Sequence, residues 1–198
     1  MKNLALMASG KGSNVEKLLE KSKELSHISV KVIITDQANA GVLDIAKKYR
    51  IPFEIVECKD LGREQHEKKI LTICKKFHIE WVLLAGYMRI LSSEFLNAFT
   101  QDSFTKIINI HPSLLPAYKG LNAFERAFND QVSESGVTIH YVDKNVDEGK
   151  VILQKSFPRK NTDTLHDFIK RGQSIEHLIY PQVLEKLNNN TLHVMRSK

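Results

Sequence analysis

Short apolar runs alternate with segments of helical periodicity over the first 110 residues of this chain. Each run predicts a buried strand, and the segments between them, where apolar residues recur every three or four positions, predict helices. Strands that alternate with helices form a parallel sheet covered on both faces. We expect strands at residues 4–7, 28–34, 53–56, 81–85 and 106–109, and helices at residues 13–26, 41–49, 63–77 and 92–99.

The alternation stops after residue 110. Gly136–Val142 and Val151–Phe157 predict two strands joined by a polar loop, and Thr162–Leu187 predicts mostly one helix. The polar residues Asn188–Asn190 then separate this helix from a short terminal strand. We therefore expect an α/β fold with a doubly wound, mostly parallel, Rossmann-like sheet and a mixed C-terminal edge. No composition shift divides the 198 residues, so one domain is expected over residues 1–198.

The composition is that of a soluble globular protein, with 42% hydrophobic and 26% charged residues. The net charge of +6 favours anionic partners, and phosphorylated metabolites fit it as well as nucleic acid does. Cys58 and Cys74 lack metal-type spacing and are expected to be free thiols in a reducing compartment. No apolar run is long enough for a signal peptide or a membrane span, so we expect a cytoplasmic protein.

The strand predicted at residues 106–109 leads into an unusual polar segment. Asn109 and His111 lie two positions apart, so in extended backbone their side chains project to the same side. Pro112 and Pro116 restrict the backbone that follows. An amide donor beside a group that titrates near neutrality suits transfer to or from a carbonyl carbon, so acyl-type chemistry is predicted here.

Ser9–Asn14 joins the first predicted strand to the first helix and contains two glycines. The free N–H groups at the start of that helix, with the side chains of Ser13 and Asn14, are suited to binding a phosphate. The segment matches neither the dinucleotide-binding nor the P-loop motif. An ordinary first turn with Ser13 as the helix cap remains an equal alternative.

The polar loop Asp143–Gly149 contains the carboxylate most interesting for His111. Asp147 is expected either to be solvated or to stand near His111, where its charge raises the pKa of the imidazole above about 6.5. His140 lies among apolar neighbours and is expected to be a hydrogen-bonded structural residue. The other histidines, such as His27, His66, His78 and His193, are expected at the surface, and no metal site is predicted because none of the histidines shows metal-ligand spacing with Asp or Glu.

Taken together, four segments resemble the phosphoribosylglycinamide formyltransferase family of purine synthesis. Their order and approximate spacing match over nearly the whole chain. The first segment and a later Gln173-x-x-Glu176 narrow the match from folate formyltransferases in general to the glycinamide ribonucleotide enzymes. The four segments are Ser9-Gly10-Lys11-Gly12-Ser13-Asn14, Ala85-Gly86-Tyr87-Met88-Arg89-Ile90-Leu91, Asn109-x-His111-Pro112-Ser113-Leu114-Leu115-Pro116 and Asp147-x-Gly149.

The resemblance implies transfer of a formyl group from 10-formyltetrahydrofolate, as co-substrate, to the amine of glycinamide ribonucleotide, by a monomer or homodimer. It implies that Asn109, His111 and Asp147 are catalytic, with His111 as general acid, Asn109 as donor to the formyl oxygen and Asp147 as the group that keeps His111 charged. The implied ribonucleotide-binding residues are Gly12, Ser13, Asn14, Gln173 and Glu176. The implied folate-binding residues are Arg63, Met88, Arg89, Ile90, Leu91, Asn109, Asp143 and Asp147.

Three residues depart from the usual family pattern: Lys11 in the phosphate turn, and Glu148 and Lys150 in the folate loop. Three other functions share part of this pattern. A hydrolase of the same folate is expected to carry an added N-terminal regulatory domain, and an enzyme that formylates aminoacyl-tRNA an added C-terminal domain and a different residue at Pro112. A phosphate- or folate-binding module without activity fits the fold but not the combination of Asn109, His111 and Asp147.

Overall fold

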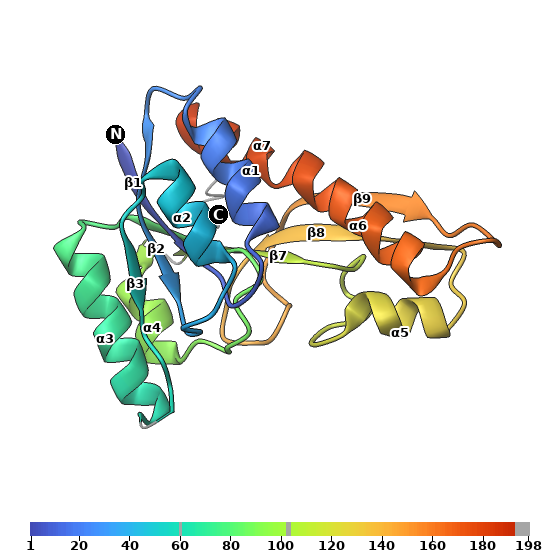
Figure 1. Ribbon diagram of the computed structural model, residues 1–198, viewed down its shortest axis with the longest axis horizontal. Helices are drawn as coiled ribbons and strands as arrows, with labels where there is room; N and C mark the ends of the chain where they lie inside the picture. The colour runs from blue at the N-terminus through green and yellow to red at the C-terminus, as the bar shows by residue number, and fades with distance from the viewer. Residues whose placement is uncertain (60, 102–103, 193–198) are drawn as a thin grey trace, which may run out of the picture.

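The computed structural model describes residues 1–59, 61–101 and 104–192. Its centre is a seven-stranded sheet in the order β3-β2-β1-β4-β7-β8-β9 (Figure 1). The first five strands in this order are parallel, and β8 and β9 are antiparallel to their neighbours. The strands are β1 (Lys2–Met7), β2 (Ile28–Thr35), β3 (Phe53–Ile55), β4 (Trp81–Leu84), β7 (Ile107–His111), β8 (Glu134–Tyr141) and β9 (Val151–Pro158). The predicted mostly parallel sheet with a mixed C-terminal edge is confirmed.

Alternate residues of β1 enter two different hydrophobic cores, because successive side chains of a strand point to opposite faces. Leu4 and Leu6 pack in the larger core, and Ala5 and Met7 in the smaller one. All four side chains are fully buried. A strand buried on both faces is the continuous apolar run that the sequence shows.

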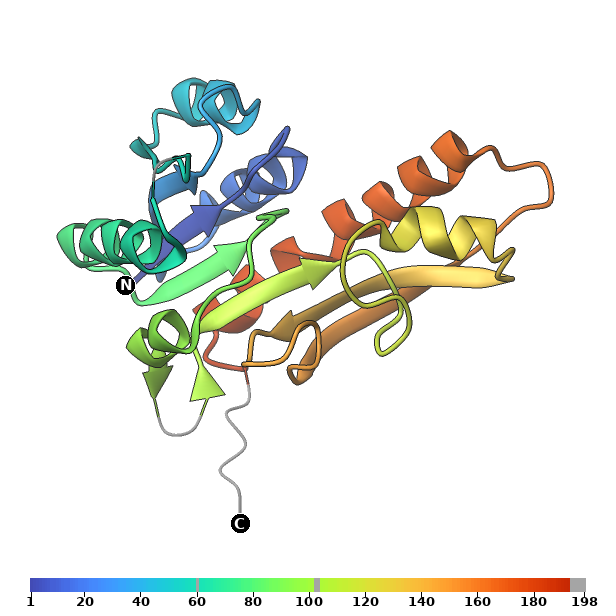
Figure 2. The ribbon, with the colours of Figure 1, turned by 90° about the horizontal axis from the view of Figure 1, so that it is seen from below.

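Helices cover both faces of the sheet (Figure 2). The larger core is closed by α1, α2, α5, α6 and α7, and the smaller core by α3 and α4. Their bounds are α1 (Ser13–Ser22), α2 (Val42–Tyr49), α3 (Arg63–Lys76), α4 (Ser93–Ala98), α5 (Ala123–Asn129), α6 (Leu165–Ile179) and α7 (Pro181–Asn188).

The antiparallel strands β8 and β9 form an arm that projects beyond the parallel strands (Figures 1 and 2). The helices α5 and α6 lie along this arm and pack against each other. Phe124 of α5, Phe157 of β9 and Phe168 of α6 form an aromatic cluster with ring centroids 5.1–6.1 Å apart. This cluster holds α6 against the sheet. The C-terminal end of α6 lies near the start of α1.

Three features differ from the sequence prediction. The long helix expected over Thr162–Leu187 is wrong, because Pro181 begins a second helix directly after Tyr180; proline lacks the N–H that a continuous helix needs at that position. The helix α5 and the short pair β5 (Thr100–Gln101) and β6 (Phe104–Thr105) were not predicted. The expected terminal strand lies outside the described residues. Among the helices of the described residues, none has the length and apolarity needed to span a bilayer.

Candidate active site

The carboxyl ends of β1, β4 and β7 meet at one edge of the sheet, because the three strands are parallel neighbours. A cavity of about 450 Å³ opens at this edge, which is where ligands bind in open α/β sheets. It is lined by Asn14, Leu84, residues 86–91, residues 109–112, residues 120–122, His140, residues 142–147 and Glu176. Another hollow, of about 590 Å³ between β3 and α3, is lined by none of the predicted site residues among those described.

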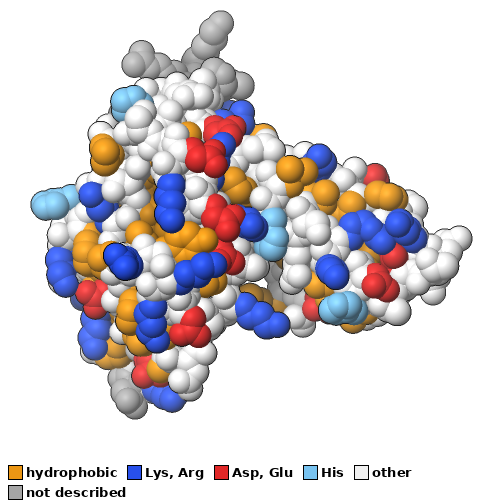
Figure 3. All heavy atoms as spheres, turned by 45° about the horizontal axis from the view of Figure 1, so that its top comes forward, with side chains coloured by type: hydrophobic (Ala, Val, Ile, Leu, Met, Phe, Trp, Pro, Cys, Tyr) orange, Lys and Arg blue, Asp and Glu red, His pale blue; other side chains and the backbone are white. Residues whose placement is uncertain are grey.

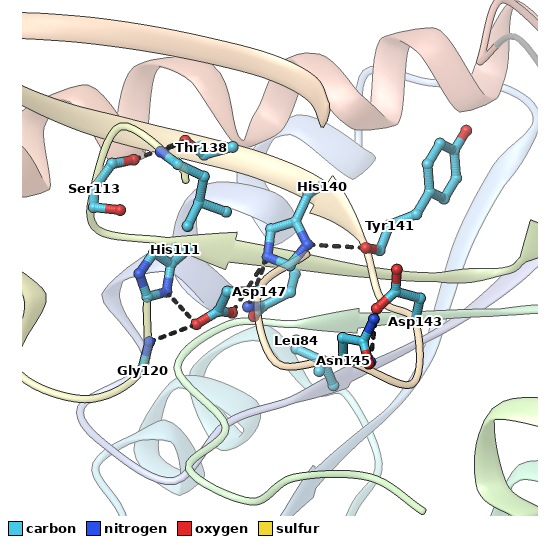
Figure 4. Close-up of polar contacts among 12 residues, drawn as sticks. Leu84, His111, Ser113, Gly120, Thr138, His140, Tyr141, Asp143, Asn145 and Asp147 are labelled. Atoms are coloured by element: carbon cyan, nitrogen blue, oxygen red, sulfur yellow. Dashed lines mark hydrogen bonds and ion pairs between the residues drawn. The ribbon is translucent and has the colours of Figure 1, made fainter. Parts of the chain in front are cut away.

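Asn109, His111 and Asp147 come together on the wall of this cavity. Figure 4 shows the imidazole of His111 facing the carboxylate of Asp147. Asn109 and His111 project from the same face of β7, as predicted from their spacing. The Nδ1 of His111 lies 3.3 Å from Oδ2 of Asp147, and its Nε2 lies 2.9 Å from the carbonyl oxygen of Tyr118. The N–H of Gly120 donates to the same Asp147 oxygen at 2.8 Å. Both ring nitrogens of His111 therefore face acceptors.

His140 is part of the same cluster, although the sequence predicted only a structural role for it. The antiparallel register places it directly opposite Asn109. Its Nδ1 lies 2.9 Å from the Tyr141 carbonyl oxygen, which can only accept, so the neutral ring carries its proton on Nδ1. The Nε2 then accepts from Nδ2 of Asn109 at 3.2 Å and lies 3.6 Å from Oδ1 of Asp147. His140 thus orients the Asn109 amide and lies beside the Asp147 carboxylate.

The pKa of His111 beside Asp147 differs from the sequence prediction. Burial lowers the pKa of His111 below its ordinary value, although the Tyr118 carbonyl and the Asp147 carboxylate oppose this effect. The expectation that Asp147 raises this pKa above the ordinary value is therefore wrong. Burial also disfavours the charged form of Asp147, but the neighbouring side chain of His140, the hydrogen bond from the Gly120 N–H and the His111 ring together outweigh it and hold the pKa of Asp147 below its ordinary value. The proximity of Asp147 to His111, by contrast, agrees with the prediction.

The loop that carries Asp147 is fixed at several points. Asp147 itself has φ of 55°, in the left-handed region that Asp tolerates better than most residues. Gly149 approaches the Tyr141 carbonyl so closely that a Cβ would lie 1.6 Å from its oxygen. Glu148 forms an ion pair with Lys119 at 2.7 Å. Glu148, one of the three residues that depart from the family pattern, therefore joins the Asp147 loop to the loop that follows His111.

The segment 86–91 forms another wall of the cavity and contains four predicted folate-binding residues. Met88 and Ile90 expose 66% and 63% of their surface, while Leu91 is buried. The guanidinium of Arg89 forms an ion pair with the buried Asp36 at 2.8 Å. The side chain of Arg89 therefore holds this segment against the end of β2.

Two other predicted folate-binding residues have different positions. Asp143 lines the cavity and accepts a hydrogen bond from the backbone N–H of Asn145 at 2.9 Å. Arg63 does not line the cavity; it begins α3 and lies 3.5 Å from Glu67. The structure therefore does not bring Arg63 to the other predicted residues.

The phosphate turn lies at the start of α1. Gly12 adopts φ of +80°, and a Cβ there would lie 2.7 Å from Cγ2 of Val42. None of the described side chains caps this helix start, so Ser13 is not a cap in this structure. Lys11 and Ser13 are exposed. The turn therefore presents backbone N–H groups close to the cavity.

A hydrogen bond connects two of the predicted ribonucleotide-binding residues, one on α1 and one on α6. Nδ2 of Asn14 donates to Oε2 of Glu176 at 2.8 Å, and both residues line the cavity. Burial raises the pKa of Glu176, and the hydrogen bond from Asn14 opposes this rise. Gln173 is exposed one turn earlier on α6 and does not line the cavity.

His66 also differs from the prediction, because it is buried rather than exposed and lies 2.9 Å from the hydroxyl of Tyr87. His193 lies outside the described residues. On the face shown in Figure 3, basic and acidic side chains are interspersed. Within the described ranges, no group of three or more His, Cys, Asp or Glu side chains is arranged to hold a metal ion.

Sequence comparisons identify relatives of this chain. The profile of the formyl transferase family matches residues 2–184. The chain is 37% identical to phosphoribosylglycinamide formyltransferase of Bacillus subtilis, over 94% of this chain and 95% of that protein. It is 35% identical to human trifunctional purine biosynthetic protein adenosine-3, over 96% of this chain but only 19% of that longer protein.

Solved structures give the same result. The crystal structure of phosphoribosylglycinamide formyltransferase from Bacillus halodurans superimposes with a TM-score of 0.90 at 36% identity, covering 99% of this chain and 100% of that one. Glycinamide ribonucleotide transformylase 1 from Symbiobacterium toebii gives 0.91 at 32% identity, covering 98% and 91%. The chain therefore belongs to the formyl transferase family and, within it, to the phosphoribosylglycinamide formyltransferases.

Proposed function

We propose that this enzyme transfers the formyl group of 10-formyltetrahydrofolate to the amine of glycinamide ribonucleotide, giving formylglycinamide ribonucleotide and tetrahydrofolate for purine synthesis. The observation that supports this most strongly is the cluster of Asn109, His111 and Asp147 on one cavity wall, in a cavity that also reaches Asn14 and Glu176. One end of the cavity offers apolar surface, and the other lies beside the start of a helix.

The apolar end suits the folate. Met88 and Ile90 present exposed side chains, and Leu91 lines the cavity from a buried position. Asp143 and the loop around it cover the pterin in this proposal. The Arg89 side chain positions this wall, and its backbone groups remain to contact the folate. Arg63, whose side chain is 55% exposed, binds the glutamate tail of the folate outside the cavity.

The polar end suits the ribonucleotide. Gly12, Ser13 and Asn14 direct N–H groups of α1 at the ribose phosphate, and the helix dipole favours its negative charge. Glu176 binds the glycinamide amine, and Gln173 binds the ribose. A cationic amine beside Glu176 would favour the charged carboxylate.

The chemistry follows from the cluster. The substrate amine attacks the formyl carbon, so the carbonyl oxygen gains negative charge, and the second N–H of Asn109 Nδ2 donates to it. That charge raises the proton affinity of the nearby His111 as it forms, so the imidazolium is favoured when it is needed. The bond to the folate nitrogen then breaks. The proton that the amine loses passes to Asp147 and from there to Nδ1 of His111, 3.3 Å away. The imidazolium formed in this way gives a proton to the folate nitrogen as it leaves, so both side chains return to their starting states.

The same proposal covers the setting of the enzyme. Residues 1–198 act as one formyltransferase domain in the cytoplasm, as a monomer or homodimer. The partners are the two small-molecule substrates, with no metal, nucleic acid or membrane taking part.

Formyl transfer from 10-formyltetrahydrofolate, measured with and without glycinamide ribonucleotide, tests the proposal. Folate absorbance and formylated product are followed together. We expect product formation that requires the nucleotide. Folate turnover without the nucleotide would instead indicate a hydrolase, and no turnover of either substrate would refute an enzymatic role.

A further inference from the structure

A row of three side chains crosses three neighbouring strands behind the catalytic cluster. His111 on β7 is in register with Thr138 on β8, and Thr138 is in register with Gln154 on β9. Thr138 is completely buried, whereas Gln154 is exposed. The row therefore leads from the catalytic histidine to the edge of the sheet.

The hydroxyl of Thr138 makes every hydrogen bond available to it. It donates to the carbonyl oxygen of Ser113 at 2.7 Å and accepts from the N–H of Leu115 at 3.1 Å (Figure 4). Nε2 of Gln154 donates to the same hydroxyl at 2.8 Å and to the Leu115 carbonyl oxygen at 3.0 Å. A hydroxyl has one proton and two lone pairs, so this set is complete.

These contacts fix the start of the loop that follows His111. Within the loop, the Ser113 hydroxyl donates to the Ala117 carbonyl oxygen at 2.6 Å and closes the turn. The next residues supply the two backbone groups that hold the catalytic pair: the Tyr118 carbonyl on His111 and the Gly120 N–H on Asp147. Both groups depend on the path of the loop.

We propose that Thr138, supported by Gln154, is a positioning residue for formyl transfer, because its hydroxyl anchors the loop whose backbone orients His111 and Asp147. The inference rests on the function proposed above. Thr138 reaches the reacting atoms only through this loop, so its loss changes the catalytic step and leaves both substrate-binding ends of the cavity unchanged.

The test compares four variants of the full chain. Thr138→Val keeps the shape and removes the hydroxyl, while Thr138→Ser keeps the hydroxyl. Gln154→Met removes the supporting donor at an exposed position, and Lys155→Met is its matched control, an exposed neighbour on the opposite face of β9. For each variant kcat and both KM values are measured, and the titration of His111 is followed by NMR.

We expect Thr138→Val to lower kcat on the order of tenfold, because a misplacement of about 1 Å can cost as much as about 10²-fold. Both KM values should stay within about twofold of wild type, and Thr138→Ser should restore kcat. Gln154→Met should lower kcat by a smaller factor, and Lys155→Met should not change it.

The titration supplies a second readout. The groups that act on His111 are Asp147, His140, Arg126 and the Tyr118 carbonyl, which favours its protonated form. The variants leave the three titratable groups in place, so a displaced carbonyl should lower the pKa of His111 in Thr138→Val.

The proposal is overturned if Thr138→Val keeps the wild-type kcat and His111 titration, or if it raises KM alone. Should Thr138→Val fail to fold, Gln154→Met decides, and wild-type kcat in that variant refutes the inference. If the wild-type enzyme shows no formyl transfer, the proposed function fails, while the NMR titration still reports whether Thr138 positions the loop.

Discussion

Replacing Gly12 by alanine should destabilise the protein and disturb the phosphate turn. The same change at Gly10 should have a much smaller effect on both. Gly12 combines φ of +80° with a Cβ position only 2.7–2.9 Å from three atoms of Val42, one of them backbone. Gly10 has open space around its Cβ position. The two glycines therefore form a matched pair within one turn.

The magnitude follows from two costs. Placing alanine in the left-handed region costs roughly 1–2 kcal/mol, and overpacking against Val42 costs about 1–3 kcal/mol. Gly12→Ala should thus lower the free energy of unfolding by about 2–5 kcal/mol. In a chain of this size each kcal/mol lowers Tm by about 2–4 °C. Gly10→Ala should stay within about 0.5 kcal/mol of wild type.

Urea denaturation of both variants measures these differences, and steady-state kinetics then measures KM for glycinamide ribonucleotide. Because Gly12 sets the direction of the N–H groups at the start of α1, Gly12→Ala should also raise this KM. The KM for the folate should change less, because the folate occupies the other end of the cavity. Equal stabilities for the two variants would refute the steric argument, and an unchanged nucleotide KM in a destabilised Gly12→Ala would refute the binding role.

Three further predictions concern the cluster and the core. Asn109→Ala and His111→Ala should each lower turnover by about 10²–10³-fold with little change in Tm, and turnover near wild type would exclude the proposed role. Asp147→Asn should lower the pKa of His111 further, since the carboxylate charge favours the imidazolium; an NMR titration at or above the wild-type pKa would contradict this. Tyr180→Phe should cost about 0.5–1.5 kcal/mol, because the buried hydroxyl donates to the Leu84 carbonyl at 2.8 Å; denaturation at the wild-type urea concentration would argue against that contribution.

The parallel half of the fold was predictable because local signals agree there. The buried strands are continuous apolar runs, and Ser92 caps α4 by accepting from the Phe95 N–H, as its position before the helix indicates. The break at Pro181 also carried a visible signal, since a proline inside a helical pattern ends or kinks the helix. The sequence pattern for α5 was too weak, because the helix has only seven residues and is held by its aromatic contacts with α6.

The candidate site was predictable only where its residues share one strand. Asn109 and His111 are two positions apart, so period-two geometry places them together without knowledge of the rest of the fold. The part played by His140 depends instead on the register between β7 and β8, which the sequence does not state. The pKa of His111 depends on burial by segments distant in the sequence, and this burial outweighs the one charge that could be anticipated, that of Asp147.

The antiparallel strand β8 is what completes the site. Parallel strands alone bring the phosphate turn and the end of β7 to one edge, but the groups that orient Asn109 and the loop after His111 come from β8. His140 and Thr138 share one face of this strand, while Val137 and Ile139 occupy the opposite face in the larger core. A slip of one residue in this register would turn both polar side chains away from the cavity and bury them against α6. The core packing of Val137 and Ile139 therefore fixes the catalytic geometry as well as the stability of the arm.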